Sequence, residues 1–138
     1  MDKLTKFVGY RIEESVFRLK AVRENEKFSI APRYSCTIKG NAERFSASLS
    51  AQIGEGVSDA PVPFDLKATV SGNFIIGEDV GSSRDLQLKT AVTVLFPYLR
   101  AFVSTLTSAS GVPPFILPFV SGDTMVSGSQ SSAPTDYN

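Results

Sequence analysis

The chain has 138 residues, and 14 basic residues balance 14 acidic ones, so its formal net charge is zero. This length fits one domain, and 42% hydrophobic with 20% charged residues is ordinary for a soluble globular protein. The lack of a basic surplus argues against nucleic acid as a partner. The lack of histidine removes the commonest general base and metal ligand.

The start of the sequence lacks the charged residues, apolar run and small-residue cleavage site of a secretory signal. The most apolar later segment is interrupted by Lys89, Pro97 and Arg100, which makes it a poor membrane span. The single cysteine, Cys36, excludes a disulfide within the chain and fits a reducing compartment. We therefore expect a cytoplasmic protein without membrane insertion.

The first half of the chain predicts an antiparallel sheet. Strict alternation of apolar and polar residues is typical of strands with one buried and one solvated face. The first strand changes parity, which suggests a bulge near Ser15–Val16. Gly40-Asn41 marks a turn. We expect the four strands at residues 7–20, 33–39, 45–53 and 64–76.

A long helix is predicted from Leu86 to Ser110. Apolar residues recur at spacings of three and four, and they are Leu88, Ala91, Leu95, Leu99, Phe102 and Leu106. Further apolar residues leave only a narrow polar stripe, formed by Thr93, Arg100, Ser104 and Thr107. A helix that is apolar on nearly all sides must be buried on nearly all sides. We therefore expect the sheet to cover one face and a neighbouring subunit's helix to cover the other.

The ends of this helix carry capping signals. Ser82 is the expected N-cap, with Asp85 three residues later in capping-box spacing. Gly111 is placed to follow the last helical residue. Pro97 lies on the polar stripe, where water or a hydroxyl could satisfy the carbonyl that it frees on Thr93, and a simple kink is equally compatible.

The segment Val112–Val120 is apolar and contains three prolines, so we expect an extended arm that lies on apolar surface. The residues that follow are almost all small or polar, with too little apolar content to fold. We therefore expect one domain at residues 1–120 and a disordered tail at residues 121–138. The fold class is α+β, with a four-stranded antiparallel sheet packed against one long C-terminal helix.

Nothing in the sequence assembles catalytic chemistry. Cys36 alternates in phase with its apolar neighbours and is expected to face the core, and no histidine can activate it. The adjacent Glu13 and Glu14 point to opposite faces of a strand. We expect no enzymatic activity, no cofactor and no metal.

The hexapeptide Leu95-Phe96-Pro97-Tyr98-Leu99-Arg100 resembles the helix of the SecB protein-export chaperone family, which carries Leu-Phe-Pro-Tyr-x-Arg there. The run from Gly111 to Pro118 resembles that family's next stretch, a Phe-Pro followed by an apolar run ending in Leu-x-Pro. The order of strands, helix and proline-rich arm also agrees over roughly residues 4–120.

The resemblance implies an ATP-independent holdase that binds unfolded or precursor polypeptides. Candidate client contacts lie where aromatic residues meet flexible backbone, at Phe64, Phe74, Phe115 and Phe119, and the alternative for each is an ordinary core residue. The resemblance also implies a homotetramer, built as a dimer of dimers, with the long helices between the sheets. We expect the oligomer interface at Leu95, Tyr98, Leu99 and Phe102. The family docks the motor SecA on an acidic outer sheet face, where Glu14 matches one position and Arg18 reverses the charge of another.

Other functions remain open at this stage. Some SecB-like proteins serve toxin–antitoxin systems, and the neutral charge fits a specific client of this kind. A non-chaperone assembly module would use the same helix to oligomerise without binding a client. A small-ligand domain would place its pocket between sheet and helix.

Overall fold

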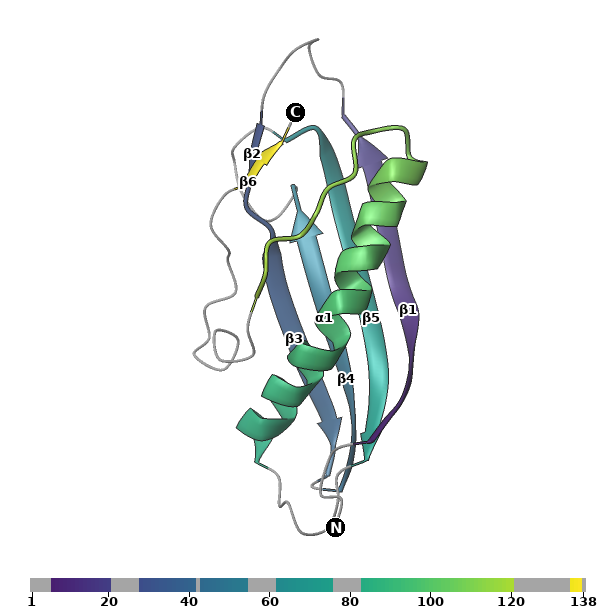
Figure 1. Ribbon diagram of the computed structural model, residues 1–138, viewed down its shortest axis with the longest axis vertical. Coiled ribbons are helices and arrows are strands. Elements are labelled where there is room, and N and C mark those ends of the chain that lie inside the picture. The colour runs from purple at the N-terminus through teal and green to yellow at the C-terminus, as the bar shows by residue number, and fades with distance from the viewer. Residues whose placement is uncertain are drawn as a thin grey trace.

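A four-stranded antiparallel sheet crossed diagonally by one long helix forms the body of the computed structural model (Figure 1). The strand order is β1-β5-β4-β3. The strands are β1 (Lys6–Leu19), β3 (Arg33–Gly40), β4 (Arg44–Ile53) and β5 (Phe64–Ile75). The structure describes residues 6–20, 28–41, 43–54, 62–75, 83–120 and 135–137. The predicted fold class is confirmed.

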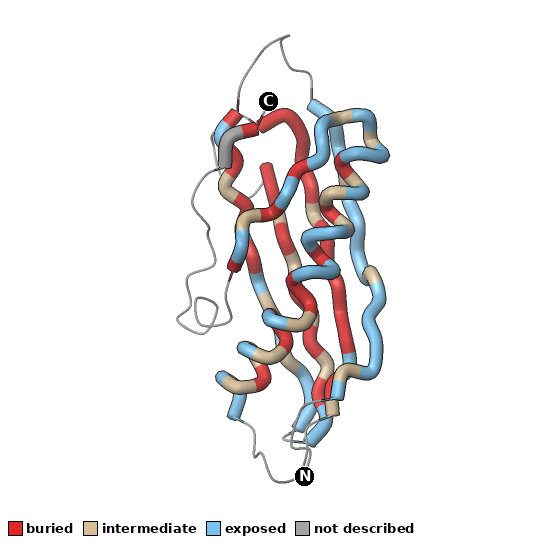
Figure 2. Tube along the Cα trace, viewed as in Figure 1, coloured by how far each residue is buried: buried red, intermediate tan, exposed pale blue. Residues whose placement is uncertain are grey.

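The two central strands, β4 and β5, carry most of the sheet's buried surface (Figure 2). On β4 every second residue is buried, and these residues are Phe45, Ala47, Leu49, Ala51 and Ile53. The intervening residues are small and polar, and they face away from the helix. The alternation of apolar and polar residues in the sequence thus gives β4 one buried and one polar face.

The edge strand β1 contains two bulges, between Phe7 and Gly9 and between Ile12 and Glu14. The predicted change of parity is therefore real, but it lies before the expected position at Ser15–Val16. After the second bulge, Phe17 packs on Phe64 with ring centroids 5.1 Å apart. The bulge keeps the apolar side chains on the helix side of the sheet, because a one-residue insertion flips the alternation.

The helix α1 spans Arg84–Ala109. Its N-cap is Ser83 rather than Ser82, which lies outside the described residues. Ser83 has extended backbone, and its hydroxyl accepts the Leu86 N–H at 3.1 Å. Two consecutive serines satisfy the capping rule equally well in sequence, so only the backbone distinguishes them. Asp85 lies in the first turn, where the helix dipole favours a negative charge.

The C-terminal end of α1 is a Schellman motif. Gly111 has φ of +88°, a conformation that favours glycine. Its N–H donates to the Ser108 carbonyl, and the Val112 N–H donates to the Thr107 carbonyl. The predicted position of Gly111 is thus confirmed, and the motif turns the arm back along the helix.

Three of the six residues of the predicted apolar stripe, Ala91, Leu95 and Leu99, are fully buried, and the other three are partly buried against the core. The buried residues of the whole helix are Gln87, Ala91, Val92, Leu95, Phe96, Leu99, Val103 and Thr107. By length and composition alone this helix could cross a membrane. Its packing against the sheet, with Leu95 and Leu99 fully buried, is that of the core helix of a globular domain.

A second, two-stranded sheet joins distant parts of the chain. It pairs β2 (Phe28–Ile30) with β6 (Thr135–Tyr137) in antiparallel register. Neither strand was predicted from the sequence, because three residues are too few for a periodic pattern. Residues 135–137 belong to the segment expected to be a disordered tail, and they are ordered as β6. The rest of that segment lies outside the described residues.

Candidate functional site

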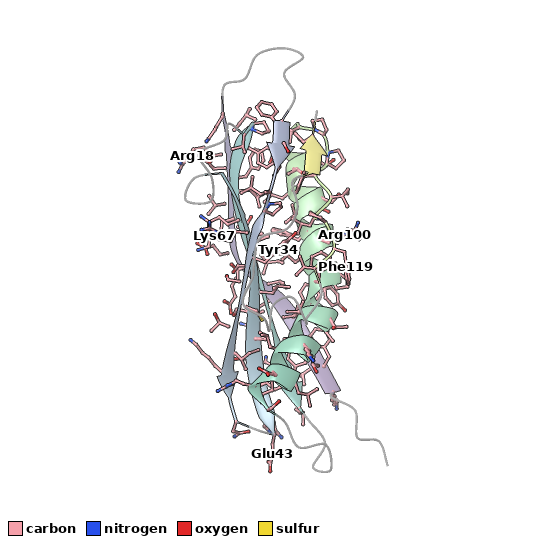
Figure 3. The ribbon with its side chains drawn as sticks, turned by 90° about the vertical axis from the view of Figure 1, so that its left-hand side faces the viewer. Arg18, Tyr34, Glu43, Lys67, Arg100 and Phe119 are labelled. Carbon is pink, nitrogen blue, oxygen red and sulfur yellow. The ribbon has the colours of Figure 1, made fainter. Side chains whose placement is uncertain are left out.

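An open apolar groove of about 480 Å³ lies between the outer side of α1 and the arm. Its lining residues are Phe96, Pro97, Arg100, Ala101, Ser104, Ile116 and Phe119. Phe119 is 75% exposed, and its ring meets the edge of Phe96 with centroids 5.9 Å apart. Figure 3 shows Arg100 and Phe119 on the helix side of the molecule. An exposed apolar patch of this kind marks an interaction site more often than a bare surface.

The arm, Val112–Val120, forms one wall of this groove because it is anchored from below. The Tyr34 hydroxyl on β3 donates to the Pro118 carbonyl at 3.1 Å. Near this anchor the side chains of the arm alternate between two sides. Phe115 and Leu117 are buried in the core, while Ile116 and Phe119 remain exposed. The predicted extended arm on apolar surface is thus present.

Thr107 is the second anchor of the arm. It was expected on the exposed polar stripe, and that expectation is wrong, because the residue is fully buried. Its hydroxyl donates to the Val103 carbonyl at 2.9 Å and accepts the Phe115 N–H at 2.9 Å. A threonine hydroxyl can donate and accept at once, so it links helix and arm.

Replacing Thr107 by valine should destabilise the protein by about 1–3 kcal/mol, because the buried Phe115 N–H loses its acceptor. Urea unfolding followed by circular dichroism measures the effect. The matched control is Thr105→Val on the exposed side of α1, which we expect to change stability by less than about 0.5 kcal/mol. Equal stabilities of the two variants would contradict the assigned role of Thr107.

The four aromatic residues proposed for polypeptide binding lie in different environments. Phe64, Phe74 and Phe115 are 0%, 1% and 2% exposed and belong to the core of this chain. Phe45 and Phe74 stack with centroids 4.9 Å apart. Phe119 alone of the four presents its ring to solvent. Of the four, it is therefore the residue that could contact a polypeptide on the surface of this chain.

The four residues proposed for an oligomer interface also divide into two pairs. Leu95 and Leu99 are fully buried against the chain's own sheet and have no surface to offer a partner. Tyr98 is 37% exposed and stacks on Tyr10 of β1 with centroids 4.1 Å apart. Phe102 is half-buried. The exposed side of the helix beside β1 therefore presents Tyr98 and Phe102.

The outer face of the sheet, opposite α1, is polar and carries mixed charge. Glu14, the proposed docking residue, forms an ion pair with Lys67 at 3.2 Å. Asp65 lies near both Lys20, at 3.1 Å, and Arg18, at 3.8 Å. Figure 3 shows Arg18 and Lys67 on this side. The acidic groups here are matched by cations, so the described part of this face is not an acidic patch.

Cys36 is half-buried on the helix side of β3, where the sequence placed it. Burial raises the pKa of its thiol to about 12. No group of histidine, cysteine, aspartate and glutamate that could hold a metal occurs among the described residues.

At about pH 8, alkylation of Cys36 by iodoacetamide should be on the order of a thousandfold slower in the folded protein than in the denatured chain. The reason is that the thiolate is the reactive species, and each unit of raised pKa lowers its population tenfold. The rate rises with pH as the thiolate fraction grows. Mass spectrometry of timed samples measures it, and equal rates in both states would overturn the placement of this residue.

Sequence reasoning missed the groove because three of its wall residues were assigned to the polar stripe of the helix. These residues are Pro97, Arg100 and Ser104, and together with Ala101 they border the arm. The alternation of Phe115 and Leu117 with Ile116 was the signal available. It indicates an arm with one buried and one exposed apolar side.

The chain is similar to proteins from archaea and bacteria. It is 32% identical over 118 residues to the uncharacterized protein MJ0357 of Methanocaldococcus jannaschii. The aligned region covers 82% of this chain and 76% of that protein. The chain is 28% identical over 130 residues to the protein-export protein SecB of Ehrlichia ruminantium, covering 91% of this chain and 72% of that protein. No family model matches the sequence.

A solved structure has the same fold. It is the Mycobacterium tuberculosis SecB-like chaperone Rv1957, in complex with a ChAD peptide from the Rv1956 HigA1 antitoxin. The TM-score is 0.65 at 12% sequence identity, over 84% of this chain and 90% of that one.

Proposed function

This chain is a divergent member of the SecB-like family, and from that premise we propose that it is an ATP-independent holdase that binds unfolded polypeptides. Proteins of this family are not enzymes, and neither is this chain. The observation that carries the proposal is the open apolar groove with Phe119 on its rim.

The groove suits a polypeptide without fixed sequence. Its walls are an aromatic ring at Phe119, a second at Phe96 and the aliphatic side chain of Ile116, which bind apolar side chains without directional demands. Arg100, at its border, makes no ion pair with any residue of the described segments. A client segment with an apolar run and a carboxylate beside it would match both parts.

Assembly into a homotetramer, as a dimer of dimers, belongs to the same proposal. β1 is an edge strand whose backbone has no partner strand on its outer side among the described residues. Large apolar residues are exposed at Val8, Tyr10 and Leu19 of this strand and at Tyr98 of the neighbouring helix. A second copy that covered this edge would remove the aggregation hazard of an open strand.

The client class is better supported than a motor partner. Glu14 is neutralised by Lys67, and Arg18 stands in the same face, so the charge pattern does not favour SecA docking. A cytoplasmic chaperone dedicated to one client, for example an antitoxin, is the second candidate. It is favoured by the SecB-like chaperone of similar fold, whose structure holds an antitoxin peptide.

The test is suppression of aggregation. The purified chain at stoichiometric amounts, without nucleotide, should reduce light scattering by a chemically denatured client diluted into buffer. Several unrelated clients distinguish a general holdase from a dedicated one. A chain that suppresses aggregation of none of them, an antitoxin included, would contradict the holdase and leave the assembly module and the small-ligand domain.

A further inference from the structure

The C-terminal strand β6 covers aromatic core residues with very few contacts. It pairs with β2 through three residue pairs, from Phe28–Tyr137 to Ile30–Thr135. Tyr137 is 8% exposed, and its ring meets the edges of Phe64 and Phe115 with centroids 5.6 and 5.8 Å apart. Its hydroxyl donates to the Pro113 carbonyl at 2.7 Å. Among the described residues, β6 is joined to the rest of the domain by this ladder and by the side chain of Tyr137.

We propose that β2 and the aromatic cluster beneath Tyr137 form a strand-addition site for an extended client segment carrying an aromatic residue. In the free chain the C-terminal strand occupies this site as an internal competitor. The inference rests on the proposed function, because it concerns how that function is regulated. It concerns a different surface from the groove beside Phe119.

The nature of the contacts supports a replaceable occupant. Backbone pairing with β2 makes no demand on sequence, so any extended segment can reproduce it. The demand comes from the space that Tyr137 fills, which is bounded by Phe64 and Phe115 and has a carbonyl acceptor at Pro113. A tyrosine satisfies every part of this space, and a phenylalanine satisfies the ring contacts alone.

The small size of the sheet supports exchange. An isolated two-stranded sheet is marginally stable in water, and β6 has only three residues. A tethered segment nevertheless competes at an effective concentration on the order of millimolar. Weakly binding segments would therefore be excluded, while a client with a better-fitting strand would displace β6.

The experiment uses the full chain and a peptide of its own residues 131–138, labelled with a fluorophore at its N-terminus. Fluorescence anisotropy measures peptide binding to the wild type, to Tyr137→Ala and to Tyr137→Phe. We expect the alanine variant to bind the peptide about tenfold more tightly than the wild type, because its internal competitor is weakened. The phenylalanine variant keeps the ring contacts and should lie between the two.

Equal binding to the wild type and to Tyr137→Ala would overturn the proposal. So would loss of the native circular dichroism spectrum in Tyr137→Ala, because a replaceable segment cannot be essential to the fold. The aggregation assay on the wild type is scored separately. If the wild type suppresses aggregation but Tyr137→Ala does not bind the peptide more tightly, only the strand-addition proposal is contradicted. If Tyr137→Ala binds the peptide more tightly but no variant suppresses aggregation, the holdase proposal is contradicted instead.

Discussion

Leu99→Asp is expected to abolish the native fold. Leu99 is fully buried between α1 and the sheet. Its replacement removes apolar packing that typically contributes about 2–5 kcal/mol, and places an unpaired carboxylate in the core at a further cost of several kcal/mol. Domains have a free energy of unfolding of about 5–15 kcal/mol in total. Circular dichroism should show no cooperative thermal transition.

The matched variant is Phe102→Asp, three residues further along the same helix. Phe102 is half-buried, on the side of α1 beside β1. We expect this variant to keep a native spectrum and to lose solution mass in light scattering, because the residue contributes to the proposed subunit interface. A folded Leu99→Asp protein would contradict the core assignment. Unchanged fold and unchanged mass for Phe102→Asp would contradict the interface assignment.

Phe119→Asp should remove most of the holdase activity while leaving the fold intact. The side chain is 75% exposed, so its loss affects stability little. An aromatic residue that is a hot spot of a binding surface contributes about 2 kcal/mol to binding, and we expect about thirtyfold more chaperone to be needed for half-suppression of aggregation. Light scattering against chaperone concentration measures this shift.

Val16→Asp is the control for Phe119→Asp. Val16 is 40% exposed and lies on the outer face of the sheet beside Lys67, away from the groove. It makes the same change of an exposed apolar side chain into a carboxylate. We expect its half-suppression concentration to equal that of the wild type. Equal losses in both variants would show that net charge, rather than the groove, determines client binding.

The sheet and helix could be predicted because one periodic pattern extends over each. On β4 the alternation identifies the buried residues one by one, and the structure places Phe45 and Leu49 in the core as the pattern requires. On β5 the alternation predicts the apolar face that includes Val70, but not the burial of Thr69 and Ser71 on the other face. The Schellman end of α1 was predictable from Gly111, because only glycine adopts its backbone conformation readily.

The candidate site was less predictable because it depends on contacts between distant segments. Nothing local distinguishes Thr107, which bonds the arm, from Thr105, which faces solvent. The helix pattern alone could not separate Leu99, buried by the sheet, from Tyr98 beside it. β2 and β6 stabilise one another only when the chain brings them together, and neither carries a pattern of its own.

The position of β1 has a consequence for the protein's own synthesis. β1 is translated before β5, its partner strand, with Lys6 opposite Ile75 in the register. β3, β4 and β5 pair with sequence neighbours and can form hairpins as they emerge, whereas β1 must wait until a long loop can close. Until then the flank of β5 lacks its neighbour, and the apolar residues of β1 stay uncovered. A nascent copy of this chain therefore passes through the same partly folded condition as the clients proposed for it.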